Sequence, residues 1–213
     1  CGAIAEHIAA LTGAIPYGMN LDSSQIEKSW KNPNLEISNF TVGDFNKPLE
    51  FDDNYFDAIY AIQPLTYVSD HAFTFKEVFR ILKPGGMFVI NDVAALDAYD
   101  SKNEHQRTLI QHTRELTVFG GLWYYKYWED SFKDAVFRLI SSTGRSAVEM
   151  IKKEVSLFDK YESLFKFLRK FRLIPKRTNA LMQRMNENSH SYIQAEEEKL
   201  LTLNWHCVGQ KPE

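Results

Sequence analysis

The first hundred residues alternate between stretches with helical spacing of apolar positions and short apolar runs. Helical spacing predicts helices over Ala3–Thr12 (ending at Gly13), Ser23–Trp30 and Phe73–Leu82. Apolar runs and strict alternation predict strands over Ile15–Met19 (closing on Asn20), Asn34–Phe40, Phe56–Ile62 and Met87–Ile90, with turns at Asp52–Asn54 and Lys83–Gly86. Such alternation of strands and helices predicts a parallel sheet with right-handed crossovers.

The second half of the chain is mostly helical in its pattern from Asn103 onward. The expected elements are a helix over Phe132–Ser142, a strand over Ala147–Val155, an apolar helical stripe over Phe158–Phe171 ended by Pro175, a polar helix over Thr178–Lys199 and a last strand over Leu201–Val208. The long helical insertion before the last strand is expected to be a cap on the domain and not a separate domain.

Composition narrows the class of protein. The 213 residues include 44% apolar and 25% charged side chains, which is ordinary for a globular chain, and a net charge of -3 gives no electrostatic reason to expect nucleic acid as a partner. Two cysteines, Cys1 and Cys207, do not make a disulfide framework, so a reducing, cytoplasmic compartment fits. No apolar run approaches the roughly 20 residues of a membrane span. The six histidines lack ligand spacing, so no metal is expected.

Three predicted strand ends carry candidate ligand-binding groups, because ligands of open parallel sheets bind beyond the carboxyl ends of the strands. Gly2 precedes a helix, where backbone N–H groups can approach a ligand. Asn20 ends a strand and is placed to bond ribose hydroxyls, and Asp44, beside an aromatic ring, can hold an adenine amino group. The alternative for Asn20 and the nearby Asp22 is a turn or a helix N-cap, and the alternative for Asp44 is a simple turn residue.

The order and spacing of these motifs resemble class I methyltransferases, and Gly18–Asp100 resembles the sterol methyltransferase family. The matching segments are Gly18–Ile26, Gly43-Asp44-Phe45, Phe51–Ile62, Lys83–Gly86 and, at the end of the chain, Lys211-Pro212-Glu213. The resemblance implies transfer of a methyl group from S-adenosylmethionine, with S-adenosylhomocysteine as product, to a carbon of a sterol or sterol-like lipid. The nematode-type enzymes that methylate the sterol ring at carbon 4 are a plausible subgroup.

The same resemblance assigns site residues. Those for the cofactor are Cys1, Gly2, Asn20, Leu21, Gln25, Gly43, Asp44, Phe45, Ile62 and Gln63. Near the substrate we expect Tyr67 and Glu115, and Asp92 also matches an acidic family position. A solvated helix face is the alternative for Glu115, and a strand-end cap is the alternative for Asp92. His112, one helical turn from Glu115, could join the site or lie on the surface.

Two departures from the family separate the function hypotheses. The first loop reads Ala3-Ile4-Ala5 where the family is richer in glycine, and Gln63 and Tyr67 stand where the family carries an acid and a histidine. A neutral Gln63 can bind by hydrogen bonds but is no base. Three hypotheses therefore stay open: a sterol C-methyltransferase, a small-molecule O- or N-methyltransferase, and a catalytically inactive binding protein with the same fold.

The resemblance also implies the architecture. We expect one α/β domain over residues 1–213: a Rossmann-like, doubly wound sheet, mostly parallel with an antiparallel last strand. Residues 1–100 form its cofactor-binding half, 101–200 the substrate cap with late sheet elements, and 201–213 the last strand. The chain opens on Cys-Gly without a methionine, so we expect the first strand to be missing and the domain to be truncated at its N-terminus.

Two segments bear on the substrate. The run Phe119–Phe132 is dense in aromatic residues, which suits the wall of a flat apolar pocket, with core packing as the alternative and Gly120-Gly121 as a hinge. Basic residues accompany the apolar stripe of Phe158–Phe171, a pattern that can rest on an anionic membrane or be a solvated face. If this helix rests on a membrane, we expect the protein to be peripheral to the endoplasmic reticulum membrane.

Overall fold

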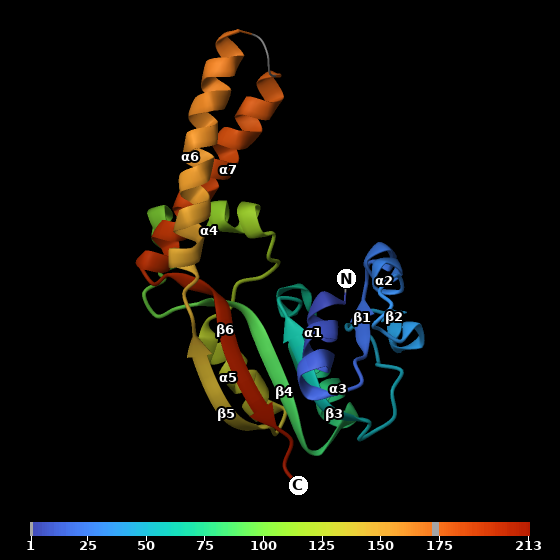
Figure 1. The fold of residues 1–213 in the computed structure, drawn as a ribbon. Coiled ribbons are helices and arrows are strands. Elements are labelled where there is room, and N and C mark those ends of the chain that lie inside the picture. Colours follow the sequence, from blue (N-terminus) through green and yellow to red (C-terminus); the bar gives the residue numbers. More distant parts are fainter. Residues whose placement is uncertain (1, 172–174) are drawn as a thin grey trace. The chain divides into compact units, whose positions relative to one another are not determined.

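The structure, a computed structural model, describes residues 2–171 and 175–213 (Figure 1). The helices are α1 (Ala3–Thr12), α2 (Ser23–Ser29), α3 (His71–Ile81), α4 (Glu104–Thr117), α5 (Tyr125–Asp134), α6 (Val148–Lys170) and α7 (Lys176–Glu197), with 3-10 turns η1 (Ile37–Asn39) and η2 (Leu65–Tyr67). The strands are β1 (Gly18–Asn20), β2 (Phe40–Val42), β3 (Phe56–Ile62), β4 (Leu82–Ala95), β5 (Arg138–Gly144) and β6 (Leu201–Gln210). They fall into two compact units, residues 1–50 (unit 1) and 51–213 (unit 2).

Unit 1 is built on two parallel strands. In β1 and β2, Gly18 lies opposite Phe40 and Asn20 opposite Val42. The small core beneath them consists of Ala5, Ile26, Leu35 and Phe40. Gly18 is needed at this position because a Cβ there would lie 2.5 Å from the Phe40 ring. The carboxyl ends of β1 and β2 therefore lie side by side, as in the predicted parallel sheet.

Unit 2 contains a four-stranded sheet in the order β3-β4-β6-β5. Strands β3 and β4 are parallel, and β6 is antiparallel to both of its neighbours. Strands β3, β4 and β5 therefore run the same way, and only the last strand of the chain is reversed. This confirms the predicted Rossmann-like α/β fold class, mostly parallel with an antiparallel last strand.

Two apolar clusters hold unit 2 together. Under one face of the sheet the rings of Phe75, Phe88, Phe132 and Phe137 meet at centroid distances between 5.2 and 5.8 Å. Near the carboxyl end of β4, a second cluster joins that strand to α4, α7 and β6, and its buried members include Val93, Leu109, Tyr192 and Leu201. The aromatic run of the sequence contributes Trp128 and Phe132, both fully buried, to the interior. For these two rings the core-packing alternative is correct.

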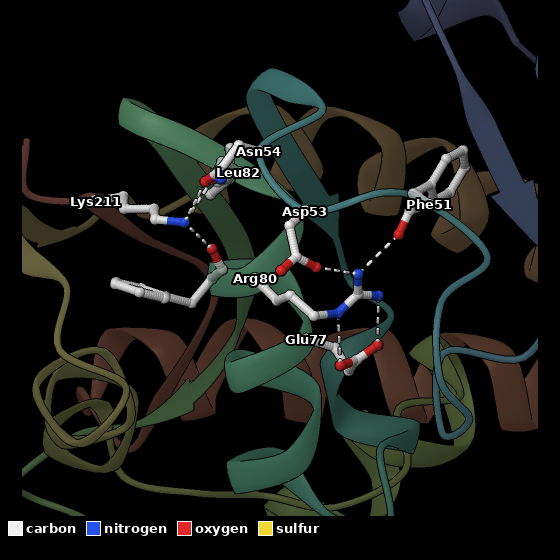
Figure 2. A network of polar contacts seen from close by, with 8 residues as sticks. Phe51, Asp53, Asn54, Glu77, Arg80, Leu82 and Lys211 are labelled. Atoms are coloured by element: carbon white, nitrogen blue, oxygen red, sulfur yellow. Dashed lines mark hydrogen bonds and ion pairs between the residues drawn. The ribbon is translucent and has the colours of Figure 1, made fainter.

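The C-terminal segment is fastened to the end of α3 by Lys211 (Figure 2). Its Nζ donates to the carbonyls of Phe79 and Leu82, at 2.9 and 2.8 Å, and to Oδ1 of Asn54 at 2.9 Å. The ammonium group also lies 4.6 Å from the centre of the Phe79 ring. A cation at a helix C-terminus satisfies carbonyls that lack helical partners. Burial lowers the pKa of Lys211 from its usual value.

A second cation, Arg80, organises the approach to β3 in the same region (Figure 2). Its guanidinium binds the Glu77 carboxylate at 2.9 Å, Oδ1 of Asp53 at 2.9 Å and the carbonyl of Phe51 at 2.7 Å. This planar donor set joins α3 to the segment that precedes β3. The start of β3 is thus positioned from the same helix that Lys211 caps.

Several predicted elements are confirmed. Helices α1 to α3 and α7, the strands β3 and β6, and the left-handed Gly13 that ends α1 lie where the pattern puts them, within a few residues. The predicted turn at Lys83–Gly86 lies inside the bounds of β4. The pairing of β4 with β3 shifts register at this turn: Phe56 pairs with Leu82, and Ala58 pairs with Met87. The four turn residues between Leu82 and Met87 therefore have no partner residue in the β3 register.

The strand predicted over Asn34–Phe40 is wrong. That segment contains a turn, the 3-10 turn η1 and only the first residue of β2. Its polar residues serve the turn: the side-chain amides of Asn32 and Asn34 donate to the Glu6 carboxylate at 2.6 and 2.5 Å. These hydrogen bonds compete with a strand ladder, as short polar side chains commonly do.

The elements predicted over Phe132–Ser142 and Ala147–Val155 are also wrong. In the first segment α5 ends at Asp134, Val136 takes a left-handed φ of 66°, and β5 begins at Arg138. In the second segment α6 begins at Val148. Both Val148 and Val155 are buried, and a spacing of seven residues places them on one side of a helix.

The predicted helical insertion before the last strand is present as a hairpin of α6 and α7. The two helices run side by side and away from the sheet, with the base of the hairpin at α4 (Figure 1). Among the described residues, no helix is long and apolar enough to cross a membrane.

Candidate functional site

The strand ends of unit 1 bring two predicted site residues together. The Gly43 N–H donates to the Asn20 carbonyl at 3.1 Å, which fixes the residue before Asp44 beside the end of β1. A Cβ at Gly43 would lie 2.4 Å from Sδ of Met19, so the two strands approach closely here. Asn20 ends a strand and Asp44 follows one, as predicted, and the structure places these two strand ends side by side, while the role of both residues stays a prediction.

The side chains at these ends are held by local hydrogen bonds. Asn20 Oδ1 accepts from the N–H of Asp22 at 2.9 Å, and Asp22 caps α2 by accepting from Ser24 at 2.8 Å. Asp44 Oδ1 accepts from both nitrogens of Asn46, and these bonds lower the pKa of Asp44. Its Oδ2 has Lys47 at 3.9 Å. The N-cap alternative is thus correct for Asp22, and Asp44 retains an ionised oxygen able to accept another donor.

Other predicted residues of unit 1 surround these ends. Leu21 is exposed, Phe45 is half-buried, and the Gln25 N–H donates to the Asp22 carbonyl in the first turn of α2. Gly2 is the N-cap of α1 and has a φ of 78°, and a Cβ there would lie 2.5 Å from Leu35. A glycine is therefore required at this position. Cys1 lies outside the described residues.

In unit 2, the end of β3 turns sharply at Gln63. This residue has a φ of 58°, in the left-handed region that a non-glycine side chain seldom adopts. Its N–H donates to the Asn91 carbonyl at 2.8 Å, and its side-chain Nε2 donates to the Leu203 carbonyl at 3.3 Å. Such backbone conformations concentrate at functional sites. The adjacent Ile62 is exposed.

A buried carboxylate holds the segment that follows Gln63. Asp92, on β4, is fully buried and accepts hydrogen bonds from the N–H groups of Leu65 and Val93, both at 2.8 Å. Desolvation raises the pKa of Asp92 to about 6, against the lowering effect of those backbone bonds and one from Thr66. The strand-end cap given as an alternative is met only in part, because Asp92 lies inside β4 and its carboxylate fixes the start of η2 on another segment.

His71 fixes η2 from the opposite side. Its Nε2 lies 2.9 Å from the Leu65 carbonyl, and its Nδ1 lies 3.0 Å from the Tyr127 hydroxyl. Burial lowers the pKa of His71, so the neutral ring donates from Nε2 and accepts at Nδ1; this tautomer is inferred from the partners. The Trp123 ring packs edge-on at 4.7 Å. Sequence reasoning missed His71, and its position as the first residue of a helix after a predicted strand end was the available signal.

The glycine pair after α4 closes over the same turn. The Gly121 N–H donates to the Thr66 carbonyl at 2.8 Å. A Cβ at Gly120 would lie 2.2 Å from that carbonyl oxygen, so only glycine allows the two backbones to meet. The segment proposed as a hinge is therefore in tight backbone contact with η2.

The two predicted substrate-side residues point to different partners. Tyr67, at the end of η2, is about half exposed, and its hydroxyl donates to the Val118 carbonyl. Glu115 is exposed on α4 and accepts from Gln111 and from Asn188 of α7, which lowers its pKa. Nearby, His112 Nδ1 lies 2.9 Å from the Ser191 hydroxyl, again on α7. Their catalytic role stays a prediction.

Within the part of the chain that the structure describes, no group of three or more His, Cys, Asp or Glu side chains could hold a metal ion. Unit 1 offers exposed hydrogen-bonding groups at its strand ends, and unit 2, taken by itself, offers a rigid turn after β3. Such groups suit an organic ligand bound beyond the carboxyl ends of parallel strands.

Comparison with known proteins agrees with this architecture. Residues 1–90 match the model of a family described as a methyltransferase domain. Phosphoethanolamine N-methyltransferase 2 of Haemonchus contortus, solved with S-adenosyl-L-methionine, superposes on 100% of this chain and 46% of its own with a TM-score of 0.65 and 18% identity. Geranyl diphosphate C-methyltransferase of Streptomyces coelicolor A3(2) covers 99% and 68%, with a TM-score of 0.67 and 12% identity.

The fold is that of a class I methyltransferase. Identities this low establish the fold alone, because enzymes that methylate nitrogen and carbon share it. The predicted resemblance to sterol methyltransferases is also confirmed: the sterol 24-C-methyltransferase of Aspergillus fumigatus is 40% identical over 111 residues, 50% of this chain and 29% of the relative. The chain thus aligns with less than a third of the length of that relative.

Proposed function

We propose that the protein transfers a methyl group from S-adenosylmethionine to a carbon of a sterol or sterol-like lipid. The observation that carries this proposal is the 40% identity to a sterol 24-C-methyltransferase, since the match reaches half of the chain. The methyltransferase fold supports the cofactor but leaves the acceptor open. Sterols reside in membranes, so this function places the protein at a membrane surface, that of the endoplasmic reticulum in a eukaryotic cell.

In the proposal the two units form one methyltransferase domain, and unit 1 supplies most of the cofactor ligands. Asp44 Oδ2, whose ion pair with Lys47 is long at 3.9 Å, accepts a hydrogen bond from the adenine amino group. Asn20 bonds the ribose, and Gly2 allows the backbone at the start of α1 to approach the amino-acid end. For Leu21, Gln25 and Phe45 in unit 1, and for Ile62 and Gln63 in unit 2, the assignment rests on the sequence resemblance.

When bound, S-adenosylmethionine supplies an electrophilic methyl group on a sulfonium. The protein's task is to hold the acceptor in line and to exclude water. In unit 2 this task falls to η2, which Asp92, His71 and the Gly120–Gly121 backbone hold rigidly. We assign Asp92 and His71 as positioning residues. Tyr67 is the substrate-side group carried by that turn.

Methylation of an alkene carbon creates a cation and then releases a proton, and nearby polar groups must manage both. The Tyr67 hydroxyl and the Glu115 carboxylate are the proposed groups. Tyr67 is the stronger candidate, because η2 sets its position, whereas the hydrogen bond from Asn188 draws Glu115 toward α7.

The alternative functions make different demands. An O- or N-methyltransferase would need a general base or a polar site for its acceptor, and the aromatic composition of Phe119–Phe132 offers few charged groups for that. An inactive binding protein would keep the Asn20 and Asp44 contacts but lose turnover. The sequence Ala3-Ile4-Ala5, which forms the first turn of α1, favours the inactive alternative, and the rigid turn after β3 favours an enzyme.

A methyl-transfer assay on the full-length protein with labelled cofactor tests these functions. Sterols and 3-keto sterols are compared with polar amines and phenols. We expect turnover of the sterol set only. Turnover of the polar set alone would eliminate the sterol acceptor, and cofactor binding without any turnover would establish the inactive alternative.

Single substitutions test the proposed roles. Tyr67→Phe and Glu115→Gln should lower kcat more than they raise KM for the sterol, because both groups act on developing charge. The matched controls are Tyr55→Phe, at an exposed ring directly before β3, and Glu149→Gln on the exposed surface of α6, which should leave both constants unchanged. Equal losses in the variants and their controls would remove Tyr67 and Glu115 from the mechanism.

A further inference from the structure

The outer half of the α6–α7 hairpin differs sharply in charge from the rest of the chain. Residues 160–184 contain eight Lys and Arg but one Asp or Glu, a net charge of +7. The remaining 188 residues hold 17 Lys and Arg against 27 Asp and Glu, a net charge of -10. A separation of this size within one chain creates a local positive field although the whole protein is acidic.

The same end of the hairpin exposes large apolar side chains. Leu164, Phe167 and Phe171 recur at helical spacing on α6 and are 48%, 55% and 62% exposed. The rings of Phe167 and Phe171 pack on each other at 5.2 Å, so they form one patch. Tyr161 on α6 and Leu181 on α7 are exposed to a similar degree. Leaving such side chains in water is unfavourable, and contiguous apolar patches mark interaction surfaces.

Basic residues lie exposed on the same segment. Arg169 and Lys170 end α6, and Arg177 lies in the first turn of α7. Lys166 also belongs to this set, although it pairs with Glu162. Apolar aromatic groups rimmed by cations fit the interface of an anionic bilayer, where rings enter the headgroup region and cations meet lipid phosphates.

The geometry of the hairpin allows this contact without moving the sheet. Helix α6 has 23 residues, or about 35 Å at 1.5 Å per residue, and its base is anchored against α4 through α7. The patch lies in the last turns of α6, at the end of the hairpin that points away from the sheet (Figure 1). A flat membrane surface that contacts the patch would therefore touch the end of the hairpin before the sheet of unit 2.

We propose that the tip of the α6–α7 hairpin, residues 160–171 and 175–184, docks the protein onto anionic lipid membranes. Phe167 and Phe171 insert among the headgroups, and Arg169, Lys170 and Arg177 bind the lipid anions. This contact is peripheral and reversible. It is independent of the methyl-transfer reaction and requires neither cofactor nor acceptor.

The test is co-sedimentation of the full-length protein with vesicles of phosphatidylcholine, alone or mixed with phosphatidylserine, in the absence of cofactor. We expect binding to the mixed vesicles that weakens as salt is raised, because salt screens the charges. Phe167→Ala/Phe171→Ala should reduce partitioning at least about tenfold. Lys170→Gln/Arg177→Gln should reduce it about fivefold per charge.

Matched controls remove equal apolar or charged groups elsewhere. Leu11→Ala/Ile15→Ala removes two side chains that are 72% and 75% exposed in unit 1, and Lys28→Gln/Lys31→Gln removes two exposed cations there. Neither control should change vesicle binding by more than about twofold. Because all these side chains are exposed, thermal unfolding should be unchanged and should exclude a folding defect in any variant.

A spectroscopic readout locates the inserted ring. Phe167→Trp should add emission that shifts to shorter wavelength on addition of mixed vesicles, and Leu11→Trp should add emission that does not shift. Equal binding by the Phe167→Ala/Phe171→Ala variant and the wild type would overturn the proposal. A second result would also overturn it: the wild-type protein does not bind vesicles but forms dimers, and the Phe167→Ala/Phe171→Ala variant is monomeric. The patch would then bind a second copy of the chain. Binding to RNA that survives loss of both rings but not of the cations, with no vesicle binding, would also overturn it.

Discussion

Asp44 follows β2 and Asp92 lies near the end of β4, yet their surroundings make them opposites. Asp44 is partly exposed, takes its hydrogen bonds from Asn46 two residues away, and has a lowered pKa. Asp92 is fully buried, binds the backbone of Leu65 27 residues away, and has a pKa raised to about 6. One aspartate ends its own strand, whereas the other joins two segments of the chain.

The difference shows that position at a strand end does not define a role. An exposed carboxylate with local partners can give an oxygen to a ligand at little cost to the fold. A buried carboxylate that satisfies backbone N–H groups cannot be spared, because each unsatisfied group would remain in the interior. We therefore expect substitutions at Asp92 to act on stability and substitutions at Asp44 to act on cofactor binding.

The largest effect is expected from Asp92→Ala. It leaves the N–H groups of Leu65, Thr66 and Val93 without their acceptor, at about 1–3 kcal/mol each. We expect a loss of about 4 kcal/mol in the free energy of unfolding, measured by urea denaturation at pH 5, where the wild-type carboxyl is largely neutral. Asp44→Ala is the comparison and should lose less than about 1 kcal/mol. Similar losses in the two variants would remove the contrast.

The pH dependence of stability should have opposite signs for the two groups. The folded-state pKa of Asp92 lies above its ordinary value of 3.8, so its contribution is fully favourable below pH 3.8 and is lost as the pH rises through about 6. The loss is about 3 kcal/mol across this window. Asp44, whose pKa is lowered, contributes stability above pH 3.8 that is lost as the pH falls through its folded pKa.

The measurement is the difference in unfolding free energy between wild type and Asp92→Asn, taken from pH 4 to pH 7. This difference between the two proteins isolates Asp92, because His71 also changes the stability with pH but in the opposite direction. The pKa of His71 is lowered by burial, so its contribution to stability is lost as the pH falls. Asp92→Asn should remove the Asp92 component and leave that of His71. A difference that is constant with pH would contradict the raised pKa.

A third effect concerns two glycines, Gly43 next to Asp44 and Gly120 against the turn η2 that Asp92 fixes. Gly120→Ala places a Cβ 2.2 Å from the rigid Thr66 carbonyl and should cost about 2 kcal/mol in unfolding free energy. Gly43→Ala meets the flexible Sδ of Met19 at 2.4 Å, which can move, and should cost less. Thermal or urea unfolding of both variants tests the ranking. The reverse order would mean that η2 is less rigid than its hydrogen bonds indicate.

The smallest effect is expected for cofactor affinity. Asp44→Ala in the full-length protein should weaken binding of S-adenosylmethionine about tenfold, or about 1.4 kcal/mol, from the loss of one hydrogen bond to the adenine. Titration calorimetry measures it, and Lys47→Ala serves as the control because its ion pair with Asp44 is long. Unchanged affinity in Asp44→Ala would remove this residue from the proposed site.

The sequence was most informative where structure is local. The apolar run Phe56–Ile62 and the helical spacing of Ala3–Thr12 match β3 and α1 residue for residue, because burial period and end signals lie within the element itself. The pattern failed over Phe132–Ser142, where the left-handed Val136 and pairing with a strand some 65 residues later decide the outcome. That pairing is a tertiary effect that local spacing does not contain.

The site divides in the same way. The sequence was enough to place Asn20 and Asp44 at strand ends, and the pairing of β1 with β2 brings those ends to one edge. The partnership of Asp92 with Leu65, and of His71 with Tyr127, joins residues 27 and 56 positions apart. No periodicity in the sequence encodes such pairs. The sequence therefore indicates only a family match or a strand-end cap for Asp92, and it indicates no role for His71.

The order of strands in unit 2 has a consequence for synthesis on the ribosome. Strand β6 is the last to be made, yet it lies between β4 and β5. The completion of β6 comes 66 residues after that of β5, a delay of several seconds at roughly 5–20 residues per second. During that interval the edges of β4 and β5 that β6 will cover stay open, while α6 and α7 can already pack on each other and on α4. The nascent chain is then most exposed to aggregation, and a chaperone that shields those two edges would act between the emergence of α6 and that of β6.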